Sequence, residues 1–240
     1  MNAPPPPEAS TAIVRADGRV RFPSRLKRRS VSSAPAKHWQ PPEGFTAEQA
    51  LAVIAAGTTE RDRLLLRVLW LTGARVSEVL ALRPMDVERD ALVLPNLKNP
   101  SRKTKRVYLP AGEADLPGTL LLWAREQGLP DTAQVFSSRN RAGDGGLRPL
   151  TRLQVWRIVK AASRRANVQV LALRDSKDGK AGEPAPIHPH LFRHARIRQT
   201  LRTSKSLPLV QRQAGWSRLQ MAYLTMGDEE ARELMRDVAE

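Results

Sequence analysis

The chain has 240 residues, of which 40 are Lys or Arg and 24 are Asp or Glu, so its formal net charge is +16. A field of that size favours a polyanionic partner: DNA, RNA or an anionic membrane surface. The absence of cysteine excludes disulfides and cysteine-based zinc sites, and four histidines are few for a metal cage. No apolar run approaches the roughly 18–20 residues of a membrane span, and the N-terminus lacks the apolar core of a secretory signal. We therefore expect a cytoplasmic protein without a membrane partner.

The first 44 residues combine a Pro-rich start, MNAPPPPEAS, with the basic stretch RVRFPSRLKRRS. Such a segment buries too little apolar surface to order itself. We therefore expect a disordered arm over residues 1–44 and an ordered domain over residues 45–240. The arm can either contact DNA phosphates through its Lys and Arg residues or remain a solvated tail.

The ordered part begins with helical patterns. Thr46 followed by Gln49 predicts a capping box at the start of an amphipathic helix. The apolar residues between positions 64 and 71 predict a strongly buried helix that stops at Gly73. The stretch RVSEVLAL predicts a further short helix.

A β-like region interrupts the helices. Residues 91–94 and 106–109 flank a basic connection that contains Pro and Asn, which predicts an antiparallel hairpin with a basic tip. Further helical patterns follow at residues 118–128, 151–168, 188–204, 207–214 and 228–239. The fold class expected from this order is α+β, mainly α, with one small antiparallel sheet.

Two clusters combine charge with an apolar framework. Arg75 follows a Gly-containing turn directly after a buried helix, and Glu78 is one helical turn away, where it can hold the guanidinium group. A rigid Arg suits bidentate binding of phosphate, although a purely structural ion pair fits the same pattern. His190 and Arg193 share a helix face and suit a proton-transfer group beside a phosphate clamp. A basic DNA-contacting helix is an equal alternative for this second cluster.

Tyr223 is one of only two tyrosines in the chain. A tyrosine hydroxyl has a pKa near 10 and is a poor nucleophile unless a base or a dense positive field promotes its ionisation. The arginines, His190 and the basic hairpin would supply such a field. This environment suits a phenolate that attacks a phosphodiester.

Three stretches in this order resemble the tyrosine recombinase (phage integrase) family. TGARVSEVLAL is similar to the family's first catalytic-arginine motif, and PHLFRHARIRQTL to its His-x-x-Arg box. AGWSRLQMAYLTMGDEEARELM is similar to the last motif, in which a His or Trp precedes the nucleophilic Tyr. The resemblance extends from about residue 45 to the C-terminus and implies the helical catalytic domain of that family.

The resemblance implies a role for each matching residue. Arg75 and Arg193 would clamp the scissile phosphate, with Glu78 supporting Arg75. His190 would be the general acid/base, and Trp216 would stabilise the transition state. Tyr223 would form a 3′-phosphotyrosine bond. Because that covalent bond preserves the phosphodiester energy for religation, the resemblance implies neither a metal nor a nucleotide cofactor.

One spacing departs from the family pattern, and the identity of the catalytic lysine is undecided. Trp216 and Tyr223 are seven positions apart, whereas the family usually places them about nine apart, and a spacing of nine would put Thr225 at the nucleophile position. The acidic stretch after Tyr223 favours Tyr223. Lys98 is our choice for the catalytic lysine, with Lys103 and Lys105 as close rivals.

The resemblance also implies partners. It predicts site-specific recombination of double-stranded DNA by a synaptic homotetramer. Family members usually carry a helical core-binding domain before the catalytic domain; this chain departs from that pattern, and we expect no separate core-binding domain before residue 45. The helix at 228–239 would pack on its own domain or on a neighbouring subunit. Two alternatives remain: a catalytically degenerate DNA-binding relative, and a type IB topoisomerase-like nicking enzyme. The expected DNA-contacting residues are Lys103, Lys105, Arg106, His194 and Arg196.

Overall fold

The structure is a computed structural model that describes residues 45–97, 103–141, 147–171, 184–185 and 187–215, together with two short strands near the N-terminus. The chain divides into two units, Met1–His38 and Trp39–Glu240. In the first unit, β1 (Ile13–Val14) pairs antiparallel with β2 (Val20–Arg21). The remainder of the arm expected over residues 1–44 lies outside the described residues. So do Lys98, Trp216, Tyr223, Thr225 and the helix expected at 228–239.

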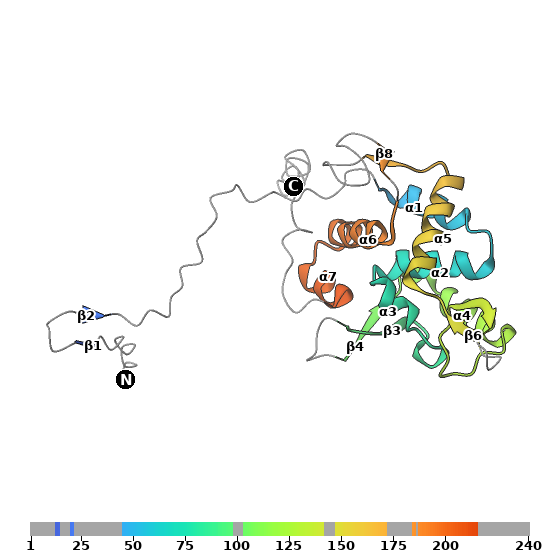
Figure 1. Cartoon of the computed structure of the whole chain (residues 1–240), viewed down its shortest axis with the longest axis horizontal. Coiled ribbons are helices and arrows are strands. Elements are labelled where there is room, and N and C mark those ends of the chain that lie inside the picture. Colours follow the sequence, from blue (N-terminus) through green and yellow to red (C-terminus); the bar gives the residue numbers. More distant parts are fainter. Residues whose placement is uncertain are drawn as a thin grey trace. The chain divides into compact units, whose positions relative to one another are not determined.

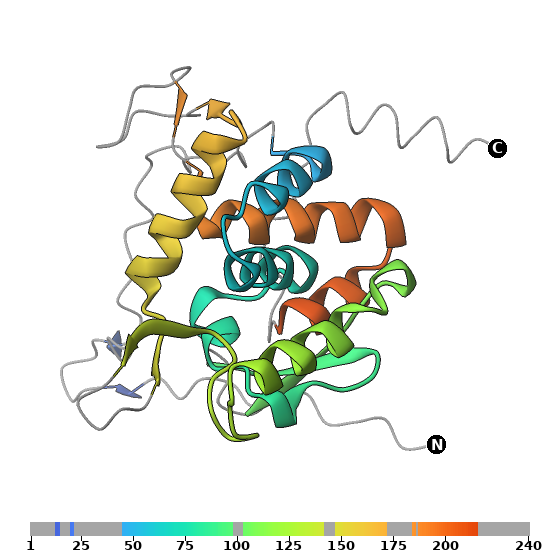
Figure 2. The same cartoon turned by 90° about the vertical axis from the view of Figure 1, so that its right-hand side faces the viewer.

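Four helices contribute to the core of the second unit. They are α1 (Ala47–Ala55), α2 (Glu60–Thr72), α5 (Arg152–Arg165) and α6 (Pro189–Ser204). Helix α2 lies centrally, with α1 and α6 beside it, and α5 crosses close to α1 and α6 (Figures 1 and 2). The residues of α2 between positions 64 and 72 are almost all buried, because the apolar pattern covers the whole circumference of this helix rather than one stripe.

The expected helix signals are present in the structure. The Thr46 side chain accepts a hydrogen bond from the backbone N–H of Gln49, whose side chain returns to the Thr46 backbone, so the predicted capping box is confirmed. Helix α2 ends at Gly73, which adopts the left-handed conformation with φ of 54°. Trp70 from α2 then packs edge-on against Phe45 and Phe192, which ties the start of the domain to α6.

The predicted hairpin is also present. Strand β3 (Ala91–Pro95) pairs antiparallel with β4 (Thr104–Tyr108), with Leu94 opposite Lys105 and Leu92 opposite Val107. Alternate residues of β4 face inward, so Lys105 and Val107 are both buried. Lys105 is therefore a charged residue at an inward position, which the tertiary surroundings must compensate.

Smaller elements complete the domain. They are α3 (Val76–Leu80), the 3₁₀ helices at Pro84–Asp86 and Ala111–Glu113, α4 (Leu116–Glu126), and the strand pairs β5 (Ser137–Arg141) with β6 (Leu147–Pro149) and β7 (Val170–Leu171) with β8 (Pro184–Ala185). Helix α7 (Leu207–Ala214) packs against both α6 and strand β4 (Figure 1). The predicted fold class, mainly helical with a small antiparallel sheet, is confirmed. In the part of the chain that the structure describes, no helix is long and apolar enough to cross a membrane.

Candidate active site

Arg75 occupies the tight connection between α2 and α3. Gly73 reverses the chain, and Arg75 then becomes the N-cap residue of α3. Glu78, at the third helical position, reaches back so that its Oε2 accepts from the Arg75 backbone N–H at 3.0 Å and its Oε1 accepts from Arg75 Nη1 at 2.9 Å. The carboxylate is completely buried and the Arg75 side chain is 18% exposed. The guanidinium is thus fixed from inside the domain while part of it remains accessible.

Lys105 is the second cation on Glu78. Its Nζ lies 2.8 Å from Glu78 Oε2, and only 4% of the Lys105 side chain is exposed. Burial lowers the pKa of Lys105 to about 8, against the opposing effect of Glu78. Burial also raises the pKa of Glu78, but Lys105 and the hydrogen bonds from Arg75 outweigh it, so the net pKa of Glu78 is lowered. Glu78 is therefore ionised at neutral pH between two positive groups.

Arg193 lies in α6, on the far side of the same cluster. Its Nη1 donates to the carbonyl oxygen of Gly73 at 2.7 Å, and its Nη2 donates to that of Ala214 at 3.2 Å. Its exposed fraction is 1%. Lys105 Nζ makes a longer contact of 3.5 Å with the same Ala214 oxygen. The structure thus brings Arg75, Glu78 and Arg193 together.

His190 and His194 follow one another on successive turns of α6. Their ring centroids are 5.4 Å apart, and His190 is exposed at the start of the helix. Burial, together with the nearby His190 and Arg193 side chains, lowers the pKa of His194 to about 4. His194 is therefore neutral at physiological pH, whereas the accessible His190 is the member of the pair that can meet a substrate.

The residues expected to contact DNA have different environments. Lys103 is exposed at the base of the hairpin tip, and Arg106 points outward and pairs with Glu88. Lys105 instead has the internal partner described above. Arg196 donates from Nε to the Leu71 carbonyl at 3.2 Å and stacks over Trp70, so its guanidinium joins α6 to α2.

Sequence reasoning did not identify two residues beside this cluster. Asn96, directly after β3, is buried and donates from Nδ2 to the Gly215 carbonyl at 3.3 Å. Gly215 has a φ of 69°, and a β-carbon there would lie 2.8 Å from Lys105 Cδ and 3.1 Å from Asn96 Nδ2. The signal for Gly215 was its position after a helical pattern, but nothing in the sequence relates it to the hairpin.

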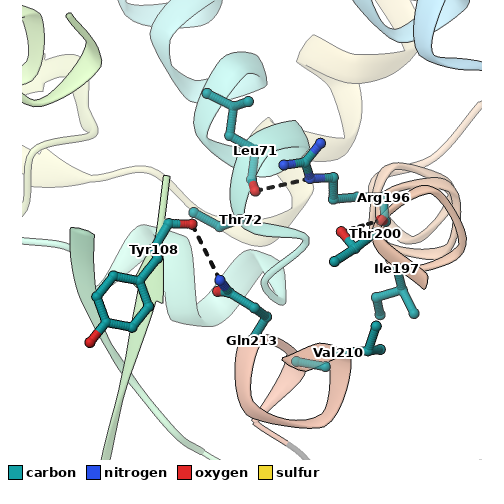
Figure 3. Close-up of a pocket in the computed structure, with 9 residues that line it drawn as sticks. Leu71, Thr72, Tyr108, Arg196, Ile197, Thr200, Val210 and Gln213 are labelled. Carbon is teal, nitrogen blue, oxygen red and sulfur yellow. Dashed lines mark hydrogen bonds between the residues drawn. The ribbon is translucent and has the colours of Figure 1, made fainter. Parts of the chain in front are cut away.

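A small cavity lies next to the cluster, between α2, α6, α7 and β4. Its volume of about 40 Å³ is on the scale of a few water molecules. Figure 3 shows that two of its lining side chains are hydrogen-bonded to the backbone: Gln213 to the Tyr108 carbonyl and Arg196 to the Leu71 carbonyl. Among the described residues, no group of three or more His, Cys, Asp or Glu is placed to hold a metal ion.

Comparison with solved structures defines the class of fold. The chain is similar to XerA recombinase, with a TM-score of 0.64 and 18% identity, covering 86% of this chain and 67% of that chain. It is also similar to a lambda integrase from a tetramer bound to a Holliday junction, with a TM-score of 0.55 and 17% identity, covering 81% of this chain and 50% of that chain. At these identities the likeness establishes the fold: that of a tyrosine recombinase catalytic domain.

Sequence comparison then gives the family. Residues 44–225 match the phage integrase family, and the chain belongs to it. Tyrosine recombinase XerC of Xanthomonas axonopodis pv. citri (strain 306) is 27% identical over 203 residues, which are 80% of this chain and 58% of that protein. The chain thus spans little more than half the length of this curated relative. The resemblance inferred from the motifs is confirmed.

Proposed function

We propose that the protein is a site-specific DNA recombinase that cleaves and rejoins strands through a covalent 3′-phosphotyrosine intermediate. The single observation that carries the proposal is that Arg193, from the distant helix α6, converges with the Arg75–Glu78 pair on one site. A guanidinium fixed by a buried carboxylate is pre-organised for a phosphate oxygen, and it needs no reorganisation as charge develops there. Membership of the phage integrase family supports the same reaction.

In this proposal the arginines bind the non-bridging oxygens of the scissile phosphate. Tyr223 attacks the phosphorus, the 5′-oxygen leaves, and His190 and Lys98 are the candidates for moving protons at the two oxygens. Trp216 donates through its indole N–H to the transition state. Because Arg193 is 1% exposed, a phosphate reaches it only after the surrounding atoms move. DNA binding is therefore coupled to a local rearrangement.

The proposed partner is double-stranded DNA. The net charge of +16 supports it, because Lys and Arg side chains that neutralise phosphates release counterions and so favour association. Lys103, Arg106 and the basic arm before residue 45 are the proposed sequence-independent contacts. We further propose a homotetramer on two DNA sites, acting inside the cell; the tetrameric assembly of the lambda integrase neighbour supports this stoichiometry.

The test is trapping of the covalent adduct on a nicked suicide substrate that carries the protein's target site. The wild type is expected to give a protein–DNA band on a denaturing gel, and Tyr223→Phe is expected to give none. Tyr108→Phe is the matched control, because Tyr108 is the other tyrosine of the chain and its hydroxyl contacts Arg212. It should retain the adduct.

Three outcomes would contradict parts of the proposal. An adduct that persists in Tyr223→Phe and disappears in Thr225→Val would move the nucleophile to Thr225. Absence of an adduct from the wild type, combined with DNA binding, would identify a degenerate relative. Relaxation of supercoiled plasmids that lack any target site would favour a topoisomerase-like activity.

A further inference from the structure

Three side chains from distant parts of the chain converge on the C-terminal end of α7. Arg193 and Lys105 both donate to the carbonyl oxygen of Ala214, the last residue of the helix. Asn96 donates to the carbonyl of Gly215, the next residue. The last carbonyls of a helix have no partner within the helix. Here the hairpin and α6 supply these partners.

Lys105 connects this end of α7 to the phosphate clamp. Its ammonium group lies between Glu78 Oε2 at 2.8 Å and the Ala214 oxygen at 3.5 Å. The other carboxylate oxygen, Oε1, holds Arg75 Nη1. A continuous series of contacts therefore runs from Arg75 through Glu78, Lys105 and the Ala214 carbonyl to Arg193.

The residues that follow Gly215 in the sequence include the proposed nucleophile. Trp216 follows Gly215 directly, and Tyr223 is nine residues after Ala214. The backbone at residues 214 and 215 is therefore the last described point before the segment that carries the proposed nucleophile. Whatever fixes these two residues sets where that segment leaves the domain relative to Arg75 and Arg193.

We propose that Lys105 is a positioning residue of the recombination reaction. It holds the Glu78 carboxylate that orients Arg75 and, through the Ala214 carbonyl, the origin of the tyrosine-bearing segment. This inference rests on the proposed function. In this role the Lys105 ammonium group keeps its two internal acceptors, Glu78 Oε2 and the Ala214 carbonyl, and does not donate a proton to the leaving oxygen.

Three charged groups surround the Lys105 ammonium, so the result of replacing Lys105 depends on whether the new side chain keeps the positive charge. The groups that act on its ammonium are Glu78, which favours the charged form, and Arg193 and Arg75, which disfavour it. Replacement by Met keeps most of the side-chain stem but leaves the Glu78 oxygen without its cation. Replacement by Arg keeps the positive charge beside Glu78.

The experiment measures single-turnover adduct formation and DNA affinity for the wild type, Lys105→Met and Lys105→Arg. Misplacement of reacting groups by about 1 Å can cost on the order of a hundredfold in rate. We therefore expect Lys105→Met to slow cleavage by about that factor with DNA affinity changed less than about twofold, and Lys105→Arg to recover most of the rate.

A substrate with sulfur at the 5′-bridging position separates positioning from proton donation. A thiolate leaves without needing a proton, so this substrate compensates for a lost general acid but not for misplaced groups. Lys105→Met should remain slow on it. Full rescue by the sulfur substrate would make Lys105 the acid and overturn the proposal, as would a wild-type rate on the ordinary substrate or a loss of DNA affinity equal to the loss of rate.

Two further measurements keep the proposal testable if Lys105→Met does not fold or if the wild type forms no adduct. Asn96→Ala removes a different contact to the same backbone and should slow cleavage by up to about tenfold without weakening DNA binding. Because the chain has no cysteine, a spin label on Ser217→Cys reports on the segment directly. Lys105→Met or Asn96→Ala should increase its mobility; unchanged mobility in a folded variant would refute the positioning role, independently of catalysis.

Discussion

Gly215→Ala provides a sharp test of the packing between α7 and the hairpin, because the chain contains a matched control. Gly215 and Gly128 both have left-handed backbones, with φ of 69° and 64°. A β-carbon at Gly128 meets nothing within 4 Å, whereas one at Gly215 would lie 2.8 Å from Lys105 Cδ. The loss of unfolding free energy in Gly128→Ala therefore measures the backbone cost alone. Subtracting it from the loss in Gly215→Ala leaves the steric cost at the end of α7.

The expected magnitudes follow from these two terms. A non-glycine residue in the left-handed region costs about 1–2 kcal/mol, so Gly128→Ala should lower the free energy of unfolding by about that amount. Gly215→Ala should lose an additional 1–3 kcal/mol or so, typical of overpacking. The Lys105 stem cannot simply swing aside, because its ammonium is held by Glu78.

The free energy of unfolding of the wild type and the two variants is measured by urea denaturation. Adduct formation is then measured at a temperature at which all three proteins are folded. We expect Gly215→Ala to be both less stable and slower in cleavage, and Gly128→Ala to cleave like the wild type. Equal losses of stability, within about 0.5 kcal/mol, would refute the close packing of Gly215 on Lys105.

Three other predictions concern the charged groups. Above pH about 8, Lys105 loses its proton in the wild type, so the cleavage rate of Lys105→Arg relative to the wild type should rise with pH; a constant ratio would contradict the assignment. Glu78→Gln should lower the free energy of unfolding at pH 7 by about 3 kcal/mol, because it breaks a buried ion pair. Since the folded pKa of Glu78 is lowered, denaturation at several pH values should show this difference shrinking as pH falls below 4.5. Arg67→Met removes partly exposed pairs with Glu113 and Asp115, so it should cost about 1 kcal/mol in thermal unfolding and leave cleavage unchanged.

The local features of the site were predictable from the sequence, and the long-range ones were not. The pairing of Arg75 with Glu78 follows from helical spacing and needs no knowledge of the tertiary fold. The inward direction of Lys105 depends on the register of β3 and β4, since a shift of one residue would turn it outward. For this reason three hairpin lysines were indistinguishable, and Lys105 was grouped with the DNA contacts although its ammonium has an internal partner. Asn96 and Gly215 meet across 119 positions of sequence, a separation at which no periodic pattern carries information.

Backbone carbonyl groups at the C-terminal ends of α2 and α7 partly neutralise the positive charge of two arginines in α6. Arg196 and Arg193 bond to the carbonyls of Leu71 and Gly73 at the C-terminal end of α2, and Arg193 reaches in addition to Ala214 at the end of α7. These carbonyls carry the negative ends of two helix dipoles. In the proposed function Arg193 binds a phosphate. These carbonyls partly neutralise its charge before any nucleic acid arrives, so the folded domain can hold this guanidinium buried until DNA binding rearranges the surrounding atoms.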